Sequence, residues 1–183
     1  MGSCMELKSK GGDIMFDMLK KPFTPALVFV VTTMYRGVCN GAPITWVTPV
    51  SYDPPSIMIS VKKESDTARN IADSGRFVVQ TVPASYYQEI HNMAAPYPRS
   101  ISEPLDQGLE LVKKDFLSIP SLAIAIDVLH CSTDTITVTG DHFQIFGDVH
   151  HHEHVVEYTN KLMYLYGTIY CNCYGKLFEA KPY

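Results

Sequence analysis

The side chains best suited to bind an anion lie close together in the first half of the chain. Lys62, Lys63, Ser65 and Thr67 follow one another just before a segment of helix-forming residues. Two ammonium groups, two hydroxyls and the N–H groups at a helix start are the donors that a phosphate needs. A lysine pair alone is more often a solvated strand end, so the neighbouring hydroxyls carry the prediction of a phosphate ligand.

The only tryptophan, Trp46, precedes these residues in a strand–turn–strand pattern. Residues 42–50 and 56–61 are predicted strands, and Asp53-Pro54-Pro55 is the turn between them. Proline lacks an N–H and biases the preceding residue towards extended geometry, so this turn cannot continue a helix. In isolation Trp46 would be a core residue, but its position also suits a flat wall for a ring.

The other elements are expected to build a mainly β fold around this unit. Further strands are predicted at residues 26–33, 76–82, 122–131 and 137–150, and a turn at 132–135. A short helix is expected from Thr67 to Gly75, and a second from Tyr86 to Met93 with Ser85 as its cap. Residues 95–120 are expected to run over the surface, with a possible helix at 109–116, and a short helix is expected to end near Tyr164. This pattern favours a barrel or sandwich with peripheral helices.

Composition limits the possible partners. The chain has 183 residues, a net charge of −4 and 46% hydrophobic residues, which predicts one folded domain without a basic field for nucleic acid. The longest apolar run, residues 26–31, is too short to cross a membrane, and no signal-peptide hydrophobic region is apparent, so we expect a cytoplasmic protein. Five cysteines are expected to be reduced thiols.

A longer ordered series of motifs supports a family resemblance. After the strand PALVFVVTT come Asn40, ITWVTP, the Asp53-Pro54-Pro55 turn, SIMISV and K-K-x-S-x-T-x-x-N-I, and later Gly140-Asp141-His142-Phe143 and IFGDV. Each piece is common by chance, but their order and spacing are specific. Over residues 22–149 the chain resembles the flavin reductase-like, FMN-binding split-barrel proteins, especially the flavoredoxin-type members.

This resemblance implies a mainly β fold, namely a six-stranded antiparallel split β-barrel with peripheral short helices. Residues 22–183 would form it, including a C-terminal tail, and residues 1–21 would be an extension. It also implies a homodimer with FMN near the contact between subunits. Reduced nicotinamide, NADH or NADPH, would pass a hydride to the flavin, or the flavin would relay electrons to an acceptor protein. A non-catalytic FMN-binding or storage module is the alternative, and FAD in place of FMN stays open.

The resemblance also assigns site residues. The isoalloxazine and ribityl side would be lined by Asn40, Thr45, Trp46, Val47, Thr48 and Pro49. The phosphate would be held by Ser60, Lys62, Lys63, Ser65, Thr67 and Asn70. His142 would be the catalytic residue, positioning the nicotinamide or assisting charge, since hydride transfer takes no proton from carbon.

A histidine run suggests a different kind of site. His150, His152 and His154 would share one face of a strand and could bind a divalent ion. Consecutive histidines are often surface residues, however, and no neighbouring cysteine or aspartate completes a ligand set. A metal-binding protein is therefore a minor alternative, and no metal ligand is assigned.

Overall fold

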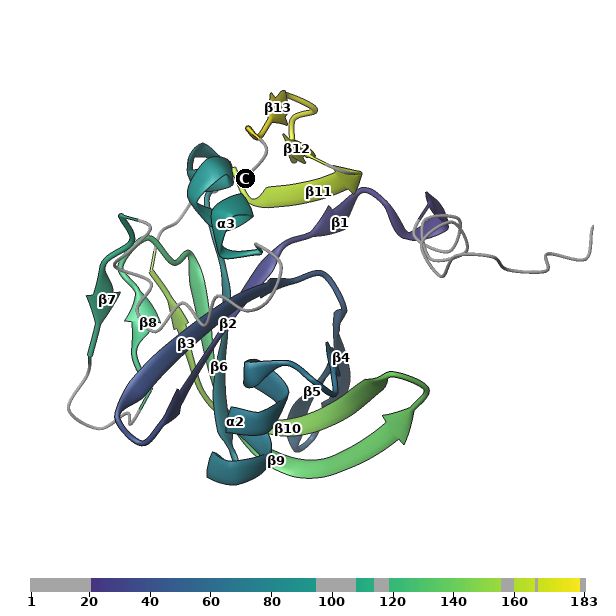
Figure 1. Cartoon of the computed structure of the whole chain (residues 1–183), viewed down its shortest axis with the longest axis vertical. Helices are drawn as coiled ribbons and strands as arrows, with labels where there is room; N and C mark the ends of the chain where they lie inside the picture. Colours follow the sequence, from purple (N-terminus) through teal and green to yellow (C-terminus); the bar gives the residue numbers. More distant parts are fainter. Residues whose placement is uncertain (1–20, 95–107, 114–118, 156–159, 167, 182–183) are drawn as a thin grey trace, which may run out of the picture.

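The computed structural model describes residues 21–94, 108–113, 119–155, 160–166 and 168–181. Within these ranges the largest sheet has seven antiparallel strands in the order β3-β2-β6-β9-β10-β5-β4. They are β2 (Phe29–Tyr35), β3 (Val38–Ile44), β4 (Val47–Tyr52), β5 (Pro55–Lys62), β6 (Arg76–Thr81), β9 (Asp127–Thr139) and β10 (His142–His154). Figure 1 shows the sheet curling around helix α2 (Asp66–Ser74), which packs against β2, β3 and β5.

One hydrophobic core lies between this helix and the sheet. The alternate β5 residues Ile57, Ile59 and Val61 are buried on one face and pack with Ala68 and Ile71 of α2. Full burial of each large aliphatic side chain contributes about 1.5–3 kcal/mol. This packing fixes the helix, and therefore its N-terminal end, beside the end of β5.

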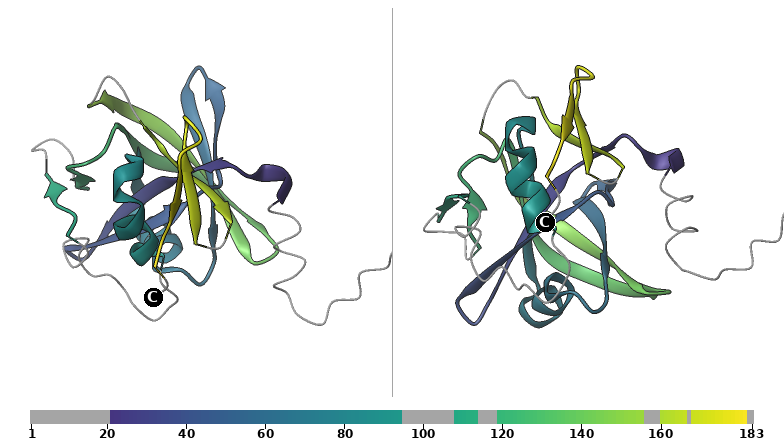
Figure 2. Two further views of the ribbon diagram at one scale, coloured as in Figure 1. Left: turned by 90° about the horizontal axis from the view of Figure 1, so that it is seen from above. Right: turned by 45° about the horizontal axis from the view of Figure 1, so that its top comes forward.

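A second core joins the opposite face of the sheet to a smaller unit. It contains Val30 and Val78 from the main sheet, Ile90 of helix α3 (Tyr87–Met93) and Tyr170. In the described part of the chain, the smaller sheet has the order β1-β11-β12-β13. Its strands are β1 (Ala26–Leu27), β11 (Leu162–Tyr166), β12 (Ile169–Asn172) and β13 (Leu177–Glu179). Figure 2 shows this sheet beside α3, on the other side of the molecule from α2.

Short elements complete the described structure. A 3-10 turn, η1 (Lys21–Phe23), precedes β1, and a second, η2 (Ala84–Tyr86), precedes α3. The two-residue strands β7 (Leu111–Val112) and β8 (Ser121–Leu122) pair with each other. No helix among the described residues is long and apolar enough to cross a membrane.

The mainly β antiparallel fold class is confirmed, although the main sheet has seven described strands and not six. The Asp53–Pro54 turn, the α2 helix and its end at Gly75 are also confirmed. Gly75 adopts φ +66 and its N–H donates to the Ile71 carbonyl, which is the geometry that ends a helix at glycine. The predicted extension and surface excursion fall largely on residues 1–20, 95–107 and 114–118, which lie outside the described residues.

Several predicted boundaries are wrong because pairing between strands overrides local sequence. The predicted strand 42–50 is broken at Thr45 and Trp46, where the chain changes partner from β2 to β5. The predicted turn at 132–135 is instead part of β9, since these polar residues pair with β10. The predicted strand 122–131 begins only at Asp127.

The predicted helix from Tyr86 to Met93 is confirmed as α3, whereas two other helix predictions and the predicted Ser85 cap are wrong. Residues 162–166, expected near a helix end, form β11 between β1 and β12. Leu111 and Val112 form a strand where a helix was expected, and the rest of that prediction falls partly outside the described residues. Ser85 lies within η2, and the first turn of α3 has no side-chain cap.

Candidate functional site

His142 is placed by a tight turn at the end of the β9–β10 hairpin. Thr139 pairs with His142, so the turn consists of Gly140 and Asp141. Gly140 has φ +59, in the left-handed region that favours glycine, and two-residue hairpins often require such a residue. The Oδ1 atom of Asp141 lies 2.7 Å from Nδ1 of His142, and this hydrogen bond holds the pKa of the exposed Asp141 below its ordinary value.

Trp46 lies beside His142 although the two residues are far apart in sequence. Their ring centroids are 5.0 Å apart and their planes meet at 43°. The Trp46 carbonyl accepts a hydrogen bond of 3.0 Å from the Ser60 N–H, which fixes the main chain between β3 and β4. The pairing of His142 with Lys62 across the sheet brings the β5 end to the same place.

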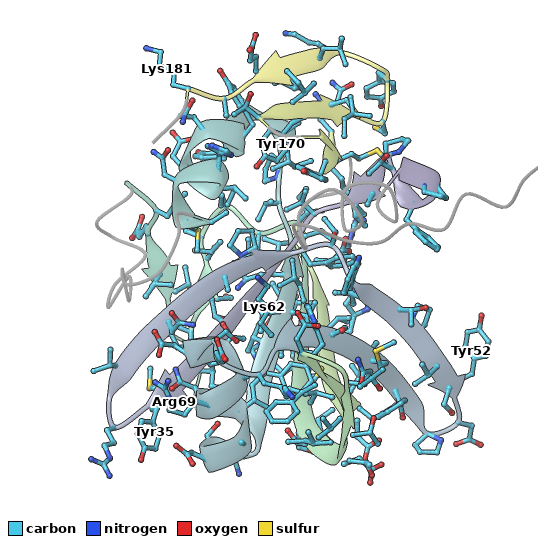
Figure 3. The ribbon with its side chains drawn as sticks, turned by 45° about the vertical axis from the view of Figure 1, so that its right-hand side comes forward. Tyr35, Tyr52, Lys62, Arg69, Tyr170 and Lys181 are labelled. Atoms are coloured by element: carbon cyan, nitrogen blue, oxygen red, sulfur yellow. The ribbon has the colours of Figure 1, made fainter. Side chains whose placement is uncertain are left out.

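The start of α2 adjoins this pair of rings. The Lys63 N–H donates to the Asp141 carbonyl at 3.1 Å, so the chain leading to the helix is tied to the hairpin turn. The Ser65 hydroxyl accepts from the Ala68 N–H at 3.1 Å and donates to the Lys62 carbonyl at 2.7 Å. Because its single proton is used in this way, Ser65 would help an anion through the helix start that it caps. Lys62 and Lys63 are exposed, and Figure 3 shows Lys62 near the middle of the molecule, beside α2.

Asn40, Thr67 and Asn70 hold the helix onto the sheet. The Asn40 amide donates to the Thr67 hydroxyl at 3.0 Å, and the Asn70 amide donates to the Thr33 hydroxyl at 3.1 Å. Thr33 and Asn40 are partners across the β2–β3 ladder, so the two bonds reach α2 from one rung. Thr67 and Asn70 are buried. In this arrangement their side chains act on the position of the helix.

The remaining predicted residues lie on or just before the edge strand β4. Thr45 and Val47 are half-buried, whereas Thr48 and Pro49 are exposed. Thr48 pairs with Met58 and Pro49 with Ile57, so they lie progressively further from the β5 end that meets His142. The structure therefore brings Trp46, Ser60, Lys62 and Lys63 to His142, and leaves Thr48 and Pro49 further along the sheet.

Sequence reasoning missed Gln144 as a candidate site residue. Its amide nitrogen donates to the Ser60 hydroxyl at 3.4 Å, and its buried Oε1 has no hydrogen-bond partner among the described residues. An unpaired buried acceptor costs about 1–3 kcal/mol, so a ligand donor at this position would be stabilising. The period of two along a strand puts Gln144 on the same face as His142, which is the signal that could have identified it.

The histidines of the run contact side chains of β9, and two of them share Asp127. His154 Nδ1 lies 2.7 Å from Asp127 Oδ1, His152 Nε2 lies 3.6 Å from the same oxygen, and His150 Nε2 contacts the Ser132 hydroxyl. A register shift between Val149 and His151 interrupts the regular alternation on which the metal hypothesis depended. Among the described residues, no group of three or more histidine, cysteine, aspartate or glutamate side chains is arranged to hold a metal ion.

Comparison with models of known protein families identifies the family of this chain. A model of the flavin reductase like domain matches residues 22–172. This chain belongs to that family. The resemblance seen over residues 22–149 is thereby confirmed, and it extends through β12 of the small sheet in this flavin reductase-like domain.

Two relatives match part of this chain. An uncharacterized protein of Halalkalibacterium halodurans is 33% identical over 119 residues, covering 62% of this chain and 57% of that protein. An uncharacterized protein of Bacillus subtilis is 31% identical over 112 residues, covering 59% of this chain and 55% of the relative. The matches therefore span little more than half the length of these two proteins.

Solved structures share the fold over most of the chain. Nitrilotriacetate monooxygenase component B from Bacillus cereus is 27% identical, with a TM-score of 0.81 and coverage of 98% of both chains. An FMN-binding protein from Thermus thermophilus, solved with bound p-hydroxybenzaldehyde, is 18% identical with a TM-score of 0.75. That similarity covers 83% of this chain and 88% of the other, and at this identity it shows the fold alone.

Proposed function

We propose that this flavin reductase-like domain binds FMN and acts as a flavin reductase or flavoredoxin-like electron carrier, with NADH or NADPH as the hydride donor. The observation that carries the proposal is the contact of Trp46 with His142 beside the lysines at the start of α2. It combines an aromatic wall, an imidazole and a cationic helix start, which are the groups that a phosphorylated ring cofactor needs.

The chemistry of the side chains fits FMN. The ammonium groups of Lys62 and Lys63 and the N–H groups at the start of α2 suit a phosphate dianion. The buried Gln144 Oε1, which has no partner among the described residues, suits an N–H donor such as the one on the pyrimidine edge of the ring. When bound, FMN would supply the redox chemistry, as the group that can accept a hydride and give up electrons.

The protein's own groups would orient the reactants. Trp46 would offer a flat apolar face, and His142 would position the nicotinamide without removing a proton from carbon. The β9–β10 turn, tied to Lys63 through the Asp141 carbonyl, would keep His142 and the phosphate side in a fixed relation. Positioning of this kind is what accelerates transfer between two bound rings.

The proposal includes a homodimer, a possible electron-acceptor protein and a cytoplasmic setting. The exposed residues Val50 and Tyr52 on the edge strand β4 support a protein contact, and Figure 3 shows Tyr52 pointing away from the molecule. Cys39, Cys131 and Cys171 are buried free thiols, as expected in a reducing compartment.

Anaerobic mixing of the FMN-loaded protein with NADH or NADPH tests the function. We expect one of the two to bleach the flavin absorbance rapidly, and His142→Gln to slow bleaching about tenfold or more. The matched control is His154→Gln, which removes an imidazole at the other end of the same strand. A loaded protein that neither dinucleotide bleaches would instead be a binding or storage module.

A further inference from the structure

The tautomer of His142 is determined by its neighbour in the chain, Asp141. Asp141 Oδ1 lies 2.7 Å from His142 Nδ1. An ionised carboxylate only accepts hydrogen bonds, so a bond of this length requires the proton to be on Nδ1. In the neutral imidazole the other nitrogen, Nε2, is then an acceptor.

The surroundings of His142 hold this arrangement in place. The ring packs against Trp46, and the histidine side chain is only 12% exposed, whereas that of Asp141 is 83% exposed. The Lys62 ammonium, across the ladder from His142, also favours the ionised form of the Asp141 carboxylate. Among the described residues, Nδ1 is the ring nitrogen that hydrogen-bonds to the protein, so Nε2 is available to a ligand.

We propose that Asp141 is a positioning residue that holds His142 with its proton on Nδ1, so that Nε2 accepts a hydrogen bond from an amide N–H of the substrate. The identity of that substrate rests on the proposed function, in which the donor is the carboxamide of the reduced nicotinamide. The tautomer itself does not depend on the proposed function. An acceptor at this position would favour a carboxamide over an analogue that lacks the N–H group.

Nitrogen NMR of the full chain with labelled histidine tests the tautomer without any turnover. Loss of one signal set in His142→Gln assigns the resonances. We expect wild-type His142 to carry its proton on Nδ1 and the Nε2–H form to gain population in Asp141→Ala, while Asp141→Asn, which keeps an acceptor oxygen, shifts less. The matched control is Asp73→Asn, which removes an exposed carboxylate on α2 and should leave the signals unchanged. A wild-type Nε2–H form, or an unchanged tautomer in Asp141→Ala, would overturn the proposal.

A substrate analogue tests the amide recognition. In the 3-acetylpyridine dinucleotide a methyl ketone replaces the carboxamide and offers no N–H. We expect wild type to prefer the carboxamide by about tenfold in kcat/KM, the contribution of one hydrogen bond, and Asp141→Ala to lose most of this preference with unchanged FMN affinity. If the tautomer shifts but the preference stays, recognition through Nε2 is wrong. If wild type binds FMN and bleaches with neither dinucleotide, the proposed function fails, and the NMR result still decides the role of Asp141.

Discussion

At the scale of single residues, the Thr67 hydroxyl links the candidate site to the stability of the fold. It accepts a hydrogen bond from the Asn40 amide, and Thr67 is only 3% exposed. Thr67→Val keeps the shape but leaves the amide unpaired, so we expect a loss of about 1–3 kcal/mol in the free energy of unfolding, measured with urea. Thr48→Val is the matched control because Thr48 is exposed, and its hydroxyl donates to the adjacent Pro49 carbonyl, its partner among the described residues. Equal stability of the two variants would show that the Asn40 contact contributes nothing.

Gly147 is a second residue whose side-chain size the fold restricts. A Cβ atom there would lie 2.5 Å from Cζ and 2.8 Å from Cε1 of Phe77, a fully buried ring. We expect Gly147→Ala to lower the free energy of unfolding by about 1–3 kcal/mol through overpacking. Phe77→Leu should relieve the clash, so the double variant should lose less than the sum of the single losses. Additive losses would contradict this explanation.

At the scale of elements, Asp127 joins three strands and the approach to a fourth. It lies at the start of β9 and receives hydrogen bonds from Thr81 of β6, His154 of β10 and Lys161, just before β11. Burial alone would raise the pKa of Asp127, but these hydrogen bonds outweigh it and hold the pKa well below the ordinary value of 3.8.

Because the pKa of Asp127 is lowered in the folded state, the free energy of unfolding depends on pH. A carboxyl group with a lower pKa in the folded state stabilises the protein above its unfolded pKa, and this contribution is lost as the pH falls through the folded value. We expect Asp127→Asn to lower the free energy of unfolding by about 2 kcal/mol at pH 7. The difference in unfolding free energy between the variant and wild type should become smaller below about pH 4. Urea denaturation of both proteins at a series of pH values measures this difference. A gap that stays constant down to pH 2 would mean that the charge of Asp127 is not involved.

The elements that could be predicted are those that local chemistry determines. The extended run 56–61 after the Asp53-Pro54-Pro55 turn identified β5, and the glycine at position 75 identified the end of α2. Residues 132–135 are polar and resemble a turn, yet they pair with β10 because β9 and β10, each 13 residues long, form a hairpin that continues through them. Similarly, Asp127 was missed as the partner of His154 because only the β9–β10 register brings them together.

The sequence indicated which residues lie at the candidate site better than it indicated the contacts between them. The order of motifs selected Trp46, Lys62, Lys63 and His142, which do lie together. The order of motifs could not reveal that the Thr67 hydroxyl accepts a hydrogen bond from Asn40, or that Gln144 lies beside Ser60. These contacts depend on how α2 and β10 pack against other strands. A single sequence does not reveal that packing.

At the scale of the whole molecule, the edge strand β4 leads to a prediction about assembly. Val50 is 46% exposed and Tyr52 is 95% exposed, which is unusual for large apolar groups on an unpaired strand edge. If β4 contributes to the proposed homodimer, light scattering will give about twice the chain mass of 20.5 kDa, and Val50→Lys will shift the protein towards the monomer. Val138→Lys, on the β9–β10 hairpin where Val138 is 63% exposed, is the control. A monomeric wild type would contradict this part of the proposal.

Binding of FMN and of riboflavin, which lacks the phosphate, tests directly whether this site holds a phosphorylated flavin. In titrations followed by flavin fluorescence, we expect wild type to bind FMN more tightly than riboflavin. Lys62→Ala with Lys63→Ala should weaken FMN binding by about tenfold or more, through loss of charge-assisted contacts, and leave riboflavin affinity unchanged. Lys113→Ala, at an exposed lysine after β7, is the control. A wild-type protein that does not bind FMN, or a double variant that binds it equally well, would contradict the account.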